Sequence, residues 1–155
     1  MSIIKIPIHS ILIACLSLML MAAGCATPSQ PWDRVTRLNV TLLRAYGSGI
    51  DILVTPRDAQ GRLVALDGTL DVKLWVYDNP RGVSFSEGSF RQEWLSIRLD
   101  KDSYDPQRGA DLSLPYDDFN PDISTLGALT LTLTDTVRSI TGDVDRIAIG
   151  SESFS

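Results

Sequence analysis

The sequence has very few residues of the kinds that catalysis and metal binding use most often. Only one of its 155 residues is histidine, His9, and only two are cysteines, Cys15 and Cys25. Beyond residue 25 the chain therefore has no imidazole or thiol to act as a general base, a nucleophile or a zinc ligand. This absence excludes serine–histidine triads, cysteine–histidine pairs and a disulfide from that part. We expect a binding or structural protein rather than an enzyme.

Positive charge is also scarce. The chain has 14 Lys and Arg against 19 Asp and Glu, a net charge of -5. Without Lys5, which lies in the first segment, the balance is 13 basic against 19 acidic residues. Phosphate neutralisation needs a basic stripe, and the sequence has none. We therefore expect no nucleic-acid partner.

Long apolar runs are limited to one stretch near the start, residues 11–21, which is interrupted only by Ser17. A spanning helix needs about 20 apolar residues, so this stretch is too short to cross a bilayer. Lys5 precedes it and three small residues, Ala22, Ala23 and Gly24, follow it. This order is typical of a secretory signal peptide. We predict that residues 1–24 form a signal peptide that is removed.

The small residues before Cys25 resemble the lipobox of bacterial lipoproteins, with Ala22 where that family most often has Leu. The resemblance implies cleavage before Cys25 and a covalent lipid on its sulfur. It also implies a membrane-anchored location in the cell envelope. Because Ala26 rather than Asp follows the cysteine, the resemblance implies the outer membrane as the expected location if the bacterium has one. Residues 25–34 are predicted to be the lipidated cysteine and a flexible tether, since Pro28 and Pro31 interrupt any helix.

Other interpretations of this segment remain open. A plain signal peptide cut at another bond, or an uncleaved anchor, would leave Cys25 as a free thiol. The tetrapeptide at 12–15 also matches the lipobox, but only residues 6–11, interrupted by Pro7 and His9, would remain as its apolar core. Cys25 is therefore the preferred lipidation site.

From Val35 onward apolar residues alternate with polar ones, which is typical of half-buried antiparallel strands. Turn residues separate these runs, and no window shows a helical face. The pattern predicts an all-β domain over residues 35–150, an antiparallel two-sheet sandwich of seven or eight strands, with a small β-barrel as the alternative and 151–155 as a tail. The expected strands include 37–42, 50–55, 70–77, 94–99, 112–114, 129–134 and 147–149.

A turn before the longest predicted strand resembles one in bacterial immunoglobulin-like and other surface β-sandwich domains. It has Asp58, Gly61 and Val64 at the matching positions, and Leu63 where those domains often have Pro. The resemblance covers about 30 residues. It implies an immunoglobulin-like sandwich and no particular ligand, because such sandwiches host many unrelated functions.

Carboxylates offer two candidate sites. Sixteen of the acidic residues are Asp, and Asp100, Asp102 and Asp105 crowd one predicted loop, where calcium is a possible ligand. The spacing departs from an EF-hand, and Asp is also a common turn residue, so turn formation is the preferred interpretation. Glu87 and Glu93 are the obvious candidates for a carboxylate pair that hydrolyses glycosides, but two solvated surface glutamates are the preferred interpretation.

Aromatic residues give the candidate binding face. If the strands at 70–77 and 92–99 form a hairpin, Trp75, Tyr77 and Trp94 lie together on the side opposite the aliphatic core. Such a face could bind a glycan or an envelope protein. The alternative is that Val83, Phe85 or Phe90 folds over it and makes a satellite cluster. We predict a membrane-anchored extracytoplasmic lipoprotein with a binding or structural sandwich domain, as part of an envelope or export assembly, or alternatively a carbohydrate-binding or calcium-binding module.

Overall fold

The computed structural model describes residues 30–77 and 88–150. The predicted signal peptide, Cys25, Glu87 and the tail lie outside these residues. The described part begins with a short helix, α2 (Pro31–Arg34), and continues with strands and one 3-10 turn, η2 (Lys101–Ser103). The strands are β1 (Val35–Tyr46), β2 (Gly49–Asp58), β3 (Gly68–Tyr77), β4 (Gly88–Leu99), β5 (Ala110–Pro115), β6 (Leu126–Thr134) and β7 (Ser139–Ala148).

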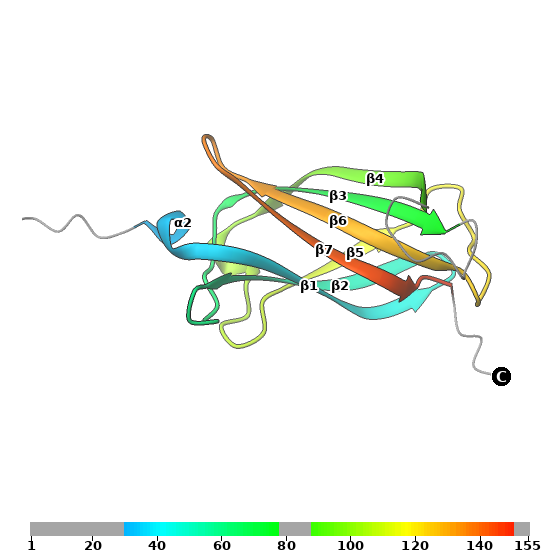
Figure 1. Ribbon diagram of the computed structural model, residues 1–155, viewed down its shortest axis with the longest axis horizontal. Helices are drawn as coiled ribbons and strands as arrows, with labels where there is room; N and C mark the ends of the chain where they lie inside the picture. Colours follow the sequence, from blue (N-terminus) through cyan, green and yellow to red (C-terminus); the bar gives the residue numbers. More distant parts are fainter. Residues whose placement is uncertain (1–29, 78–87, 151–155) are drawn as a thin grey trace, which may run out of the picture.

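The seven strands form two antiparallel sheets packed face to face (Figure 1). The smaller sheet has the order β1-β2-β5, and the larger has the order β4-β3-β6-β7. Two hairpins, β1–β2 and β3–β4, are followed by β5, which returns to the first sheet, and by the hairpin β6–β7. Seven strands in two packed antiparallel sheets, divided three and four, confirm the predicted two-sheet sandwich. The barrel alternative is wrong, because among the described strands no ladder joins one sheet to the other.

The core lies between the sheets and consists almost entirely of aliphatic side chains. Strands β2, β3 and β6 are central, and their inward residues have no exposed surface: Ile50, Ile52, Val54, Leu70, Val72, Leu74, Leu129, Leu131 and Leu133. The predicted alternation is confirmed at each of these positions. Each buried aliphatic side chain stabilises the fold by about 1.5–3 kcal/mol, so a core of this size holds the two sheets together.

The turn between β2 and β3 is organised by Asp58, whose side chain is almost fully buried. Its carboxylate accepts hydrogen bonds from the backbone N–H groups of Gln60 and Arg62 and an ion-paired one from Arg62 Nε at 2.8 Å. Gly61 has a φ of 80°, which glycine adopts without strain. Burial acts to raise the pKa of Asp58, but the bonds from Arg62 and Gln60 outweigh it and hold the pKa below its usual value.

We expect the Asp58 carboxylate to make the free energy of unfolding depend on pH in the acid range. A folded-state pKa below the unfolded value gives stability that is present above the unfolded pKa and is lost as pH falls through the folded pKa. Asp58→Asn should therefore be less stable than wild type at neutral pH, with the difference narrowing in acid. Urea unfolding of both proteins across this range measures the difference. A difference that stays constant down to strong acid would contradict the assignment.

The edge strands β1 and β7 lie side by side and run in the same direction although they belong to different sheets (Figure 1). They are in close contact at Gly142, where a Cβ would lie 2.1 Å from the Leu38 carbonyl oxygen. Glycine at 142 is therefore required by the approach of the two strands rather than by backbone conformation.

The described residues include no helix that is both long enough and apolar enough to cross a membrane.

Candidate functional site

The outer face of the larger sheet carries an aromatic pair. Trp75 on β3 lies directly opposite Phe90 on β4, and their rings meet edge to face with centroids 5.7 Å apart. Phe90 is 50% exposed, and Trp75 is half-buried above Ala128 of β6. Within the described part of the chain, the Trp75 indole N–H is buried and has no hydrogen-bond partner. We define the Trp75–Phe90 pair as the outer aromatic patch.

Charged side chains lie beside the outer aromatic patch. Lys73 and Glu93 face each other across the same two strands and are both exposed. Lys73 is on the outer face because it is two positions from Trp75 in a strand that alternates sides. Glu93 shares that face because it stands directly opposite Lys73, on the far side of a register shift that separates it from Phe90. The patch therefore has a charged border, which is typical of binding surfaces.

Trp94 does not belong to this face, so its predicted placement beside Trp75 and Tyr77 is wrong. The register between β3 and β4 shifts after Leu70, so that Asp71 stands opposite two residues, Leu95 and Ser96. Ser96 has a φ of 59°, and its N–H donates to the Asp71 carboxylate at 2.8 Å. The extra residue reverses the side on which the preceding residues point. Trp94 consequently pairs with Val72 and points inward.

The same bulge overturns a core prediction. Alternation within the predicted strand 94–99 places Leu95 on the core side together with Ile97 and Leu99, but Leu95 is 56% exposed. Leu99 is buried, because it lies beyond the bulge, where the expected alternation holds.

Trp94 helps to close the gap between β4 and β5. Its indole N–H donates to the Pro115 carbonyl at 2.7 Å, and its ring packs against Tyr116. Buried Gln92 donates to the same carbonyl at 3.0 Å and accepts from the Asp117 N–H. These side chains join the two sheets where no backbone ladder does, so Trp94 is part of the framework of the sandwich.

Tyr116 connects this closed gap to the far end of β7. Its hydroxyl donates to the Ile149 carbonyl at 2.9 Å, and its ring meets Phe119 edge to face. Arg91 lies over the Phe119 ring and donates to the Asp118 carbonyl. Burial raises the pKa of the Tyr116 hydroxyl, with a smaller contribution from Tyr46, so Tyr116 stays a neutral donor.

Tyr77 is buried and does not form an exposed surface. Its side chain is 8% exposed, and its hydroxyl donates to the carboxylate of Asp145 on β7. Of the three predicted face residues, Trp75 alone is a half-exposed aromatic on the outer side. The proposed cover by Val83 and Phe85 lies outside the described residues, whereas Phe90 packs against Trp75 as that alternative expected.

The carboxylates predicted as weak calcium ligands act as caps of their own loops. Asp100 accepts from the N–H groups of Asp102 and Ser103 and so caps η2. Asp105 accepts from the N–H groups of Gln107 and Arg108. No three His, Cys, Asp or Glu residues among those described are grouped to hold a metal ion. Asp58 and Asp135 likewise accept hydrogen bonds from backbone N–H groups of their own turns. The general preference of Asp for turns is the only sequence signal that could have indicated these two residues.

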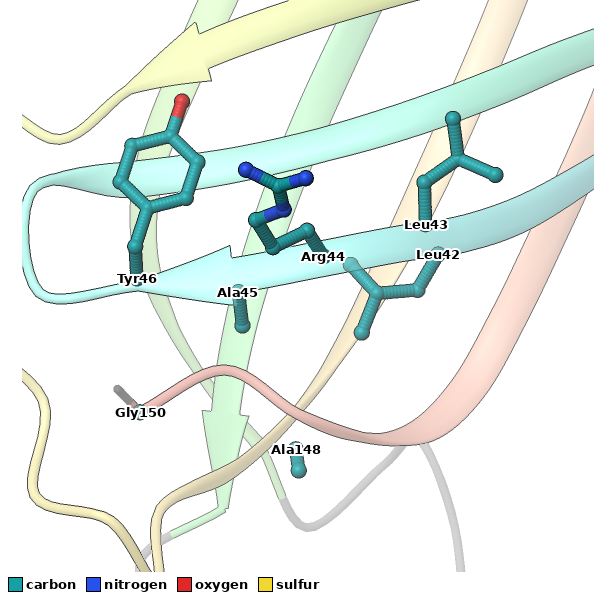
Figure 2. Close-up of a pocket in the computed structure, with 7 residues that line it drawn as sticks. All are labelled: Leu42, Leu43, Arg44, Ala45, Tyr46, Ala148 and Gly150. Carbon is teal, nitrogen blue, oxygen red and sulfur yellow. The ribbon is translucent and has the colours of Figure 1, made fainter. Parts of the chain in front are cut away.

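Apart from the outer aromatic patch, the molecule has a concave surface where β1 and β7 separate beyond Gly142. It has a volume of about 660 Å³ and is lined by β1 residues 42–46 together with Ala148 and Gly150. Figure 2 shows Leu42 and Ala45 directed from β1 toward Ala148, while Leu43 and Arg44 project to the other side of the strand. We call this surface the β1–β7 groove. No sequence pattern indicates this groove, because it depends on the spacing of two edge strands far apart in the chain.

Comparison of this chain with family models, with curated proteins and with solved structures finds no match.

Proposed function

We propose that this chain is a lipid-anchored binding domain of a bacterial cell envelope, which contacts a protein partner through the outer aromatic patch. The observation that carries the binding role is the half-exposed Trp75–Phe90 pair on the face away from the core. Aromatic side chains on an otherwise polar sheet supply large contact area at low entropic cost. The Ala22–Cys25 junction supports the anchor, and on this proposal the outer membrane is the expected location.

A protein partner is favoured over catalysis by the chemistry of the described residues. The border of the patch has one cation and one anion, Lys73 and Glu93, and both are solvated. Both side chains are exposed, and within residues 30–77 and 88–150 neither has a hydrogen-bond partner. A charged border around an apolar centre fits recognition instead.

A carbohydrate is the second candidate ligand. The exposed ring of Phe90 could stack on a sugar, and Lys73 and Glu93 could bond its hydroxyl groups. An experiment can distinguish the protein partner from the carbohydrate ligand. Crosslinking from a photoreactive residue at Phe90 in intact cells would identify an envelope protein, whereas retention on cell-wall glycan would favour the carbohydrate. A photoreactive residue at Val137 is the matched control, because Val137 is 87% exposed and lies between β6 and β7, outside the patch.

The anchor is tested at Cys25. We expect mass spectrometry of the mature N-terminus to find Cys25 acylated, because a small-residue segment directly precedes it. The Cys25→Ala protein should lose the lipid and leave the membrane fraction. Cys15→Ala is the control and should change neither property, since Cys15 lies in the segment that is removed. An unmodified Cys25 in membrane-bound wild-type protein would sink the lipoprotein assignment.

A further inference from the structure

The hydrogen bonding of β2 fixes the direction of the main-chain groups of β1. The Pro56 carbonyl accepts from the Val64 N–H at 2.9 Å, on the side of β2 away from β1. Main-chain groups of successive strand residues point to alternate sides. Thr55, Leu53 and Asp51 therefore face β1, and their partners in register are Asn39, Thr41 and Arg44.

Four other β1 residues direct their N–H and C=O groups away from β2. These residues are Leu38, Val40, Leu42 and Ala45, which stand opposite Pro56, Val54, Ile52 and Ile50. At Leu38 the outward carbonyl meets Gly142 of β7. Beyond that crossing the strands separate, and the outward groups of Leu42 and Ala45 open into the β1–β7 groove.

The groove thus combines two features of a strand-addition site. Leu42 and Ala45 present apolar side chains on the groove side of β1 (Figure 2), and the same two residues present main-chain donors and acceptors at the free edge of β1, the edge with which none of the described strands pairs. A ligand that satisfies both must be an extended peptide, since only another strand matches the spacing of these main-chain groups. Side chains alternate along such a peptide, so one face would fill the groove and the other would lie beside Arg44.

The charge of β1 indicates which kind of peptide would bind at this edge. Strand β1 contains two arginines, Arg37 and Arg44, and no acidic residue, although the whole chain carries a net charge of -5. Two copies of β1 paired with each other would bring these arginines together, which disfavours a symmetric dimer through this edge. An acidic strand is complementary to it.

We propose that the free edge of β1 in the β1–β7 groove binds an extended acidic segment of another protein by strand addition. The segment has small apolar side chains at alternate positions and carboxylates on the opposite face. This surface lies on the β1–β7 side of the sandwich, separate from the outer aromatic patch, so the inference does not depend on the proposed function.

Peptides of alternating valine and aspartate, or of alternating valine and lysine, test this directly against the full-length protein in detergent micelles. Residue-resolved amide exchange by NMR is the readout. We expect the aspartate peptide to slow exchange at the Val40, Leu42 and Ala45 amides, and the lysine peptide to leave these amides unchanged. Arg44→Glu should reverse this preference.

Arg37→Glu is the matched control. It makes the same charge change on the same strand but outside the groove, and it should keep the preference for the aspartate peptide. Unchanged far-ultraviolet dichroism of both variants shows that β1 remains paired with β2. The proposal is overturned if neither peptide protects these amides, if both protect them equally, or if protection falls on β4 instead.

Discussion

Trp94→Ala is expected to lower the free energy of unfolding by about 3 kcal/mol or more, in the range found for truncation of large aromatic side chains in protein interiors. The indole packs against the core from the gap between the sheets, and it donates to the Pro115 carbonyl. Its removal leaves a cavity between β4 and β5, where no backbone ladder supports the sandwich. Thermal and urea unfolding of the variant measure the loss.

Trp75→Ala is the matched comparison and should cost only about 1 kcal/mol. Trp75 lies on the outer face, is not packed against the core, and makes no hydrogen bond through its indole N–H among the described residues. If it forms part of a binding surface, the variant should lose partner crosslinking while it stays folded. A loss of stability at Trp75 equal to that at Trp94 would make the outer aromatic patch a structural cluster rather than a site.

Gly142→Ala is expected to be nearly as damaging as loss of Trp94, by about 2–3 kcal/mol, because overpacking at this position cannot be relieved by a side-chain rotation. The new methyl group would lie 2.1 Å from the Leu38 carbonyl oxygen and 3.0 Å from the carbonyl carbon. Both atoms belong to the backbone of β1, so β1 and β7 would have to move apart.

Gly61→Ala is the control for this substitution. Position 61 has open space around it but a φ of 80°, so an alanine there meets backbone strain alone. Its cost should be about 1–2 kcal/mol. Unfolding of both variants in urea compares them, and a Gly142→Ala protein as stable as wild type would show that the strands are not held at this separation.

Period-two alternation predicted the strands best where the sheets are regular. Strands β3 and β6 pair without a shift in register, and their predicted core residues are buried. The register shifts occur instead between a central strand and an edge strand, as at Leu42 and Arg44 of β1. A bulge adds one residue without changing composition, so the sequence pattern cannot locate it.

The candidate site was predicted less well than the fold for the same reason. Trp94 was assigned to the wrong face because the bulge at Leu95 and Ser96 depends on a bond from the Ser96 N–H to Asp71, on a neighbouring strand. Trp75 was placed correctly on the outer side, because β3 itself is regular against β6. Phe90 was considered only as a cover, since a second shift in register determines that it faces Trp75.

The direction of β1 sets how far a bound partner would be held from a lipid surface. The strand has 12 residues, and at 3.3 Å per residue its ends are about 36 Å apart. With an anchor at Cys25, the chain enters the domain beside α2, at the opposite end of β1 from the groove (Figure 1). When the domain stands upright, the groove lies at the end of the domain that is farther from the membrane. When the domain lies flat, the groove comes down to the headgroups, so tilting on the tether would present the same edge strand at different heights above the bilayer.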